Sequence, residues 1–391
     1  MAEPQHADYI REIYARGLGG EQPMLPVAVA DLEQAALEAM DPNAVAYVFA
    51  AAGTEDTMRA NREAFRRWRI APRMLRDVAE RDLSTKVLDH EMQAPIMLAP
   101  VGAQKINHPD GELATARAAR ALSVPIVAST VSAYSLEEIA EANGDSTRWF
   151  QLYWAVDDEI AKSMVERAEA AGYSAIVLTV DAFMLGWKPR DLQQAWAPFL
   201  HQIGIANYLA DPVFLSRLDA TPEEDPGVAI GHFVQQFANP SLTWDRLDWL
   251  RSITDLPILL KGILRVDDAR RAAERDIDGI IVSNHGGRQV DGSVASLEAL
   301  PAIVEEVGDR MAVLFDSGVR SGADVFKALA LGANAVLIGR PYIWGLALGG
   351  QDGVETVLRM LLAEFDMTLA LSGYTKATEL DRDALVRAPL D

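Results

Sequence analysis

The chain has 391 residues, a formal net charge of −21 at pH 7 and no cysteine. Binding to nucleic acid or to an anionic membrane needs basic surface, so we expect neither as a partner. The missing cysteines exclude disulfides, thiol nucleophiles and Cys-ligated metals, and we predict no metal site. Residues 1–21 lack the basic start and apolar run of a signal peptide, and we expect a cytoplasmic protein.

The N-terminal segment, residues 1–94, precedes the first predicted strand, and we expect it to be largely helical. One helix start is indicated by Asp41-Pro42. An aspartate there can cap the free backbone N–H groups, and proline suits the first helical position.

The remainder, residues 95–391, alternates short apolar runs with amphipathic helical stretches. Near-continuous apolar strands are typical of a parallel sheet that is buried on both faces. Eight such runs predict a (β/α)8 TIM barrel, which makes residues 1–391 a single α/β domain. An open sheet would need a Gly-rich phosphate turn after an early strand, and we find none. The predicted strands are residues 95–100, 125–130, 149–154, 175–181, 257–262, 279–285, 312–316 and 335–339.

A long excursion, residues 182–247, separates the fourth predicted strand from the fifth and is rich in Pro, Phe and Trp. Excursions of this length are usually functional, and we expect one that resembles a lid over a site. The alternative is a packed surface insertion or a contact between subunits.

The candidate site residues, most of them polar or glycine, lie where the predicted strands end. Active sites in this fold lie at the C-terminal ends of the strands. Together these residues bring a base, an acid and several cations to one rim of the barrel. They are Pro100, Val101, Gly102, Ser129, Gln151, Tyr153, Thr179, Asp181, Lys261, Ser283, His285, Arg288, Asp316, Ser317, Gly318, Val319, Arg320, Gly339 and Arg340.

The ends of the last two strands indicate a phosphate site. Gly318 and Gly339 leave backbone amides free to approach an anion, and Arg320 and Arg340 can hold phosphate oxygens with forked donors. A helix expected to start near Ser321 adds the positive end of its dipole. The alternative is a set of ordinary turn glycines and surface arginines.

His285 is the candidate general base. It ends an apolar strand, and Gly-Gly-Arg follows it, so that the backbone can pass close to a ligand and Arg288 can bind a carboxylate with two hydrogen bonds. Asp181, at the end of another strand, can orient the imidazole and stabilise its protonated form.

Lys261 and Tyr153 are less specific signals. Lys261 ends a buried apolar strand and needs an anionic partner, which is either a bound anionic ligand or the carboxylate of Asp181 or Asp316. Tyr153 lies on an apolar strand, and by itself it fits a core residue as well as a site residue.

Several motifs resemble the FMN-dependent 2-hydroxy acid oxidase and dehydrogenase family, and the resemblance covers nearly the whole chain. The most specific motif is SNHGGRQ at 283–289, supported by PDGE at 109–112, LKG at 260–262 and IGRP at 338–341. Within the family the chain looks most like lactate 2-monooxygenases. The stretches that carry this likeness are RML at 73–75, GWKPRD at 186–191 and NYLADPVF at 207–214.

The resemblance implies a role for each matching residue. His285 would take a proton from the substrate with support from Asp181, and Lys261 would stabilise reduced FMN. Three further residues would bind substrate: Arg288 and Tyr47 through its carboxylate and Tyr153 through its oxygen. FMN would lie against Pro100, Val101, Gly102, Ser129, Gln151, Thr179 and Ser283, with its phosphate among Asp316, Ser317, Gly318, Val319, Arg320, Gly339 and Arg340.

The resemblance also implies the reaction, in which a small L-2-hydroxy acid is oxidised and the electrons pass to O2. A lactate 2-monooxygenase converts L-lactate to acetate and CO2, whereas an oxidase releases a 2-oxo acid and H2O2. Gly102 favours the monooxygenase, because the oxidases typically carry alanine at this place. Some dehydrogenases of the family also carry glycine there, so a dehydrogenase is a further alternative. Relatives are usually tetramers or larger, so we expect a homo-oligomer.

Two departures from the family pattern leave a substrate other than lactate open. Lys188 stands where the family has an arginine, so we expect a substrate-binding cation without the guanidinium fork, for which Arg190 could compensate. The Ala50-Ala51-Ala52 run replaces a glycine pair of the relatives, and its methyl groups could narrow the pocket or shift Tyr47.

Two rival functions are less well supported. A phosphate-binding barrel such as inosine monophosphate dehydrogenase needs a cysteine nucleophile, which this chain lacks. A non-catalytic FMN-binding barrel would not need the complete set of candidate catalytic residues, which comprises His285, Arg288, Asp181, Tyr153 and Lys261.

Overall fold

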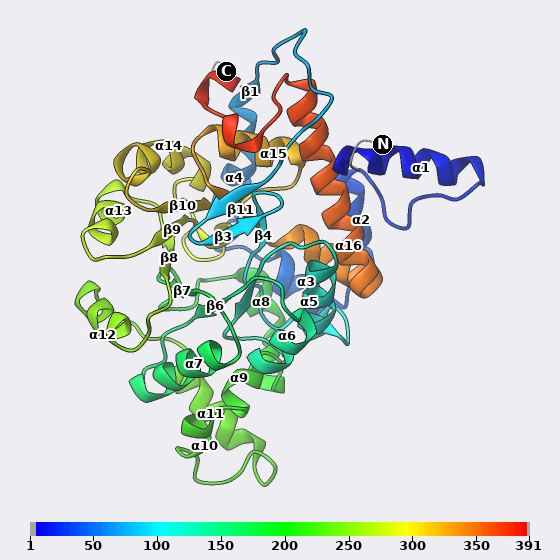
Figure 1. The fold of residues 1–391 in the computed structure, drawn as a ribbon. Coiled ribbons are helices and arrows are strands. Elements are labelled where there is room, and N and C mark those ends of the chain that lie inside the picture. Colours follow the sequence, from blue (N-terminus) through cyan, green and yellow to red (C-terminus); the bar gives the residue numbers. More distant parts are fainter. Residues whose placement is uncertain (1–4, 389–391) are drawn as a thin grey trace.

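The computed structural model describes residues 5–388 (Figure 1). Its centre is a closed barrel of eight parallel strands in the order β10-β11-β4-β5-β6-β7-β8-β9, so the predicted (β/α)8 barrel is confirmed. Each strand lies inside one of the eight predicted runs or overlaps it by all but one residue. The strands are β4 (Ile96–Leu98), β5 (Ile126–Ser129), β6 (Arg148–Leu152), β7 (Ile176–Thr179), β8 (Ile258–Ile263), β9 (Gly279–Val282), β10 (Ala312–Phe315) and β11 (Ala335–Ile338).

Helices surround the barrel and cover the outward-facing strand residues (Figure 1). These helices follow the strands in sequence, as the fold requires. They are α5 (Gly111–Ala121), α6 (Leu136–Asn143), α7 (Asp158–Ala170), α12 (Leu247–Ser252), α13 (Val266–Ala273), α14 (Ser296–Val307), α15 (Gly322–Ala330) and α16 (Arg340–Leu371).

The barrel interior is a packed core. One buried side chain from each strand meets there, because alternate strand residues point inward. Val87 and Met92, from a hairpin of β2 (Thr85–Val87) and β3 (His90–Met92), join this cluster at the other end of the barrel from the site described below. The inward residues are Met97, Val127, Trp149, Val177, Leu259, Ile281, Leu314 and Leu337.

The N-terminal segment is helical only in its first part. Its helices are α1 (Tyr9–Leu18), α2 (Val29–Ala39), α3 (Pro42–Phe49) and α4 (Asp56–Arg66), and the Asn43 amide donates to Asp41 at 2.8 Å, as the capping prediction requires. The expectation of helix was wrong for 67–94, which forms β1 (Trp68–Ile70), β2 and β3. The strand β1 pairs with β12 (Leu385–Arg387), a partner too distant in sequence for a local pattern to reveal.

The excursion after β7 folds into short helices that extend from the barrel beside α7 (Figure 1). Its helices are α8 (Pro189–Gln194), α9 (Ala206–Leu209), α10 (Pro212–Leu215) and α11 (Pro226–Gln236). Aromatic rings from these helices and their connections stack on one another, with Phe233 in contact with Phe199, Tyr208 and Phe237. These buried rings are continuous with the apolar cluster between the barrel strands and their surrounding helices.

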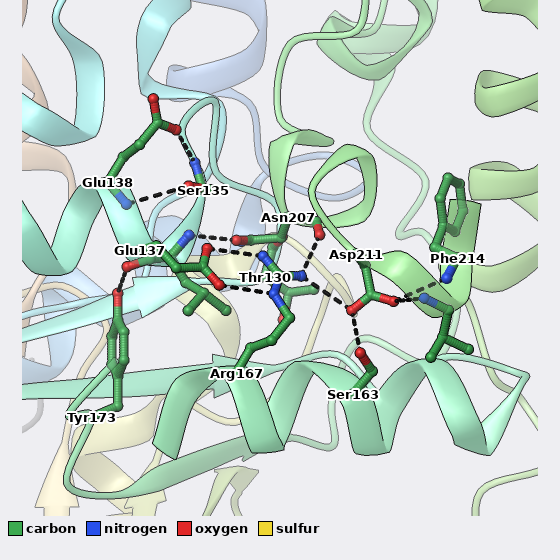
Figure 2. A network of polar contacts seen from close by, with 12 residues as sticks. Thr130, Ser135, Glu137, Glu138, Ser163, Arg167, Tyr173, Asn207, Asp211 and Phe214 are labelled. Carbon is green, nitrogen blue, oxygen red and sulfur yellow. Dashed lines mark hydrogen bonds and ion pairs between the residues drawn. The ribbon is translucent and has the colours of Figure 1, made fainter. Parts of the chain in front are cut away.

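Asn207 attaches the excursion to the barrel (Figure 2). The side chain is fully buried, and its amide donates to the carbonyls of Ser129 and Thr130 at 3.1 and 2.9 Å. Its oxygen accepts from the amide of Leu136 at 2.7 Å. One residue of the excursion thereby satisfies three buried backbone groups, two at the end of β5 and one at the start of α6.

Asp211 makes the second attachment, to α7 (Figure 2). Its carboxylate accepts from the Ser163 hydroxyl at 2.8 Å and from Arg167 at 3.1 Å, and it caps α10 through the amides of Val213 and Phe214. A buried carboxylate with this many donors is well compensated for its lost hydration. Among residues 5–388 no helix is long and apolar enough to cross a membrane.

We predict that Asn207→Ala lowers the free energy of unfolding by about 2–4 kcal/mol, because three buried backbone groups lose their partner. Urea denaturation of the intact protein measures the change. Asn239→Ala is the matched control in the same excursion. Its amide donates to the Ala155 carbonyl at 3.3 Å, and its oxygen accepts only from the exposed amide and hydroxyl of Ser241, at 3.3 and 2.7 Å. Because water can replace the exposed partners, this substitution should cost below about 1 kcal/mol. Equal losses in the two variants would contradict the anchoring role of Asn207.

Candidate active site

A cavity of about 520 Å³ opens at the C-terminal ends of the strands. It brings together most of the residues that the sequence analysis selected, because parallel strands of a closed barrel all end at the same rim. Those that line it are Tyr47, Pro100, Val101, Gly102, Ser129, Tyr153, Lys188, Lys261, His285, Arg288, Asp316, Ser317, Gly318, Val319, Arg320, Gly339 and Arg340.

Four selected residues lie outside this lining. Asp181 contacts His285, Ser283 contacts Lys261, and Gln151 contacts Ser129, so that these three support residues that line the cavity. Thr179 lies beside Lys261 in the pairing of β7 with β8.

His285 and Asp181 form the predicted pair, with 2.8 Å between Nδ1 and Oδ1. The chain turns sharply after β9, and His285 has a φ of 59°, a left-handed conformation that is strained for a residue with a side chain. Gly262 makes room for the acid, since a Cβ on this glycine would lie 2.6 Å from that of Asp181. The loop geometry thus brings the His285 imidazole to the cavity, with its Nδ1 held by the Asp181 carboxylate.

Burial keeps the imidazole of this pair neutral. Burial lowers the pKa of His285 below its usual value, and Lys261 adds to this effect while Asp181 opposes it. Burial acts to raise the pKa of Asp181, but the neighbouring His285 and Lys261 outweigh it and lower that pKa. A neutral imidazole beside an ionised carboxylate is the form that can accept a proton.

Lys261 is buried and charged. Its ammonium donates to the Ser283 hydroxyl at 3.0 Å and lies 3.3 Å from Asp316. Burial acts to lower the pKa of Lys261, but Asp316 and Asp181 raise it above its usual value. The ion pair that the sequence left open is therefore present, and the lysine still lines the cavity.

Arg288 is held so that part of its guanidinium remains free. Its Nη1 donates to the carbonyls of Tyr47 and Ala50 at 2.7 and 2.9 Å, and the group lies 5.3 Å from the centre of the Tyr47 ring. Both bonds use a single nitrogen, which leaves Nε and Nη2 as donors for a carboxylate. The Ala50 carbonyl also accepts from Arg340.

The two departures from the family pattern, Lys188 and the run 50–52, differ in whether they line the cavity. Lys188 lines the cavity 3.7 Å from Asp191, and burial together with Arg288 lowers its pKa to about 8. Arg190 lies outside the lining and pairs with Glu55, so it does not compensate for Lys188. The run 50–52 is buried behind the cavity, and its methyl groups do not narrow it.

The end of the cavity where we predicted a phosphate carries Arg320 and Arg340. Within residues 5–388, the side-chain donors of Arg340 reach the carbonyls of Val48, Ala50 and Gly286, at 2.9 to 3.2 Å, and no carboxylate. Burial and the neighbouring Arg288 lower the pKa of Arg340 to about 9. Burial and Arg62 lower that of Arg320 to about 10. The helices α15 and α16 also begin here, and both present the positive end of their dipoles.

These residues fit FMN. Gln151 and Thr179 each bury a polar atom, Nε2 and Oγ1, that finds no hydrogen-bond partner within residues 5–388. Unpaired buried polar atoms are costly, so a ligand with polar edges is expected to meet them. A flavin ring against Pro100, Val101 and Gly102 would do so, with its phosphate at the cationic end.

Comparison with known proteins gives the same assignment. A family described as FMN-dependent dehydrogenase matches residues 36–387. The chain belongs to this family. L-lactate oxidase from Lysinibacillus sphaericus (strain C3-41) is 45% identical over 94% of this chain and 94% of its own. 2-Hydroxyacid oxidase 1 from Homo sapiens is 42% identical over 94% of this chain and 99% of its own.

Solved structures agree. The crystal structure of mandelate oxidase superposes with a TM-score of 0.82 at 41% identity, covering 92% of this chain and 98% of that one. The chain is accordingly an FMN-dependent oxidoreductase that oxidises 2-hydroxy acids, and FMN is its cofactor. Within residues 5–388 no group of three His, Asp or Glu side chains lies close enough together to hold a metal ion.

Several cavity residues were missed by the sequence analysis. Phe199 and Phe237 of the excursion line the cavity, and they pack edge-on against Tyr47 and Tyr153 at ring-centre distances of 6.3 and 5.2 Å. The spacing of four residues between Phe233 and Phe237 is a helical pattern that could have indicated them. Further lining residues from the excursion are Trp196, Ala197 and Leu200.

We predict that Gly102→Ala lowers the free energy of unfolding by about 1–3 kcal/mol, because overpacking forces the backbone to move. The new Cβ would lie 2.4 Å from the Val131 carbonyl oxygen and 2.6 Å from its Cγ2. Chemical denaturation and FMN titration of the variant measure the effect. Gly231→Ala in α11 is the control, since nothing lies within 4 Å of its Cβ and helix propensity favours alanine. A Gly102 variant as stable as the control would contradict the close contact.

Proposed function

We propose that the chain oxidises a small L-2-hydroxy acid, with L-lactate as the first candidate, and passes the electrons to O2. The observation that carries this proposal is the His285–Asp181 pair opening into one cavity with Arg288 and Tyr153. A base, a carboxylate-binding cation and a phenol in one enclosed space match the three functional groups of such a substrate. The relative named L-lactate oxidase supports the choice of lactate.

Different side chains bind the substrate and accept its proton. FMN, when bound, supplies the electron acceptor for the oxidation. The carboxylate of the substrate binds Arg288 and Tyr47, with Lys188 adding positive charge to the same cavity. Since Nδ1 of His285 is held by Asp181, Nε2 is the atom that takes the proton from the substrate.

Two further residues complete this assignment. Burial raises the pKa of the Tyr153 phenol, so it stays protonated and donates a hydrogen bond to the substrate oxygen. Lys261 remains charged beside the cavity, where its ammonium would favour electron uptake by FMN when the cofactor is bound.

Acetate and CO2 are the products we propose, as for a lactate 2-monooxygenase. Gly102 supports this outcome through the family resemblance, in which the oxidases typically carry alanine at this place, and here a Cβ would lie only 2.4 Å from the Val131 carbonyl oxygen. The second candidate is an oxidase that releases pyruvate and H2O2, which the names of the relatives favour.

We further propose a homo-oligomer of four or more subunits in the cytoplasm. An apolar stripe on α1, formed by Ile10, Tyr14 and Leu18, is exposed and supports association between subunits. The absence of cysteine fits a reducing compartment.

We expect L-lactate to bleach the yellow protein under anaerobic conditions, and air to restore the colour. Flavin absorbance follows the first step, and assays for acetate, pyruvate and H2O2 identify the products. His285→Ala is the matched variant, which should keep FMN but bleach at least about 100-fold more slowly, because general-base catalysis contributes about that much. A variant rate within about tenfold of the parent would remove the proton-accepting role from His285.

The Lys188 pKa of about 8 predicts a pH dependence. The protonated lysine attracts the substrate carboxylate and is lost as pH rises through about 8, so kcat/KM should fall above that pH. Lys188→Arg should move this fall to higher pH, because a guanidinium stays charged. Steady-state profiles between pH 6 and 10 measure it, with Lys162→Arg on α7 as the control. Unchanged profiles in both variants would exclude Lys188 from substrate binding.

A further inference from the structure

A second cavity of about 250 Å³ lies beside the active site, at the ends of β7 and β8. Its walls are mainly apolar and aromatic, and they include Trp154, Trp244, Leu247 and Leu260. An apolar cavity of about 150 Å³ is enough to hold a benzene molecule, so this space could hold an aryl group.

Phe237 stands between the two cavities. Three residues, Tyr153, Ala182 and Phe237, line both of them. Phe237 belongs to the excursion rather than to the barrel, and its ring centre lies 5.2 Å from that of Tyr153 in an edge-on arrangement. The wall therefore consists of Tyr153, which would touch substrate, and of Ala182 and Phe237, which belong to the excursion.

The position of Phe237 is fixed by its surroundings. Its ring packs on Phe199 and Phe233 at ring-centre distances of 5.6 and 5.2 Å. The preceding residue, Gln236, accepts from the backbone amides of Val156 and Asp157 through its carbonyl and its side-chain oxygen, at 3.2 and 2.8 Å. The end of α11 is thus attached to the loop after β6, and this attachment keeps the Phe237 ring between the two cavities.

We propose that Phe237 is the specificity-determining residue that limits substrate side-chain length, and that the second cavity is the subsite for an aryl side chain once Phe237 is removed. The inference rests on the proposed function, in which the Tyr153 phenol binds the substrate oxygen. A substrate held there lies beside Phe237, so a methyl group fits while a phenyl group meets the ring.

The experiment compares the parent with Phe237→Ala on L-lactate and L-mandelate. We expect the ratio of kcat/KM for mandelate to that for lactate to rise at least about tenfold, which is the usual size of such a pocket effect. Calorimetric titration with two unreactive 2-oxo acids, pyruvate and phenylglyoxylate, gives a readout without turnover. The ratio of their dissociation constants should move in the same direction.

Trp244→Ala is the matched control, because Trp244 lines only the second cavity and its removal enlarges that space without opening the wall. Its mandelate-to-lactate ratio should stay within about twofold of the parent. If Phe237→Ala does not retain FMN, Phe237→Leu is measured in its place by the same ratios.

Three results would overturn the proposal. They are an unchanged ratio in the folded, FMN-loaded Phe237 variant, a ratio that rises equally in Trp244→Ala, and a parent enzyme that already favours mandelate. A parent that is bleached by no 2-hydroxy acid would instead contradict the proposed function, so the two failures are distinguishable.

Discussion

Positive charge gathered in the cavity at the strand ends is the constraint on which the rest of this site depends. Five cations line the cavity, and within residues 5–388 carboxylate partners lie within ion-pair distance of Lys188 and Lys261 only. Burying an unpaired charge is costly, so such a cavity is stable in the company of anionic ligands. The three arginines match the two anions that the reaction needs, a phosphate and a carboxylate. They are Arg288, Arg320 and Arg340.

The same charges prepare the base. Burial lowers the pKa of His285, Lys261 and Arg288 add to this effect, and Asp181, which opposes it, holds the ring through Nδ1. The imidazole is therefore neutral before substrate arrives, and the proton that it takes is stabilised by a carboxylate already in contact. One arrangement of cations thus supports ligand binding and proton transfer together.

The barrel and the excursion contribute different things to the site. Strand ends hold the chemical groups, because the hydrogen-bonded ladder leaves those positions little freedom. The excursion supplies shape through Phe199 and Phe237, and it is attached to the barrel by Asn207 and Asp211. Since this attachment does not involve the catalytic residues, the size of the substrate pocket can differ while the chemistry stays the same.

The sequence by itself determined the barrel, the family and the strand-end residues, because each depends on apolar runs and motifs formed by residues that are close together in the sequence. Only the tertiary structure decided contacts between distant segments. It showed that β1 pairs with β12 and that Phe237 lies between two cavities. It also showed two ion pairs, Arg190 with Glu55 and Lys261 with Asp316. Such contacts depend on how elements pack in space, and neither the periodicity nor the composition of a segment encodes its distant neighbours.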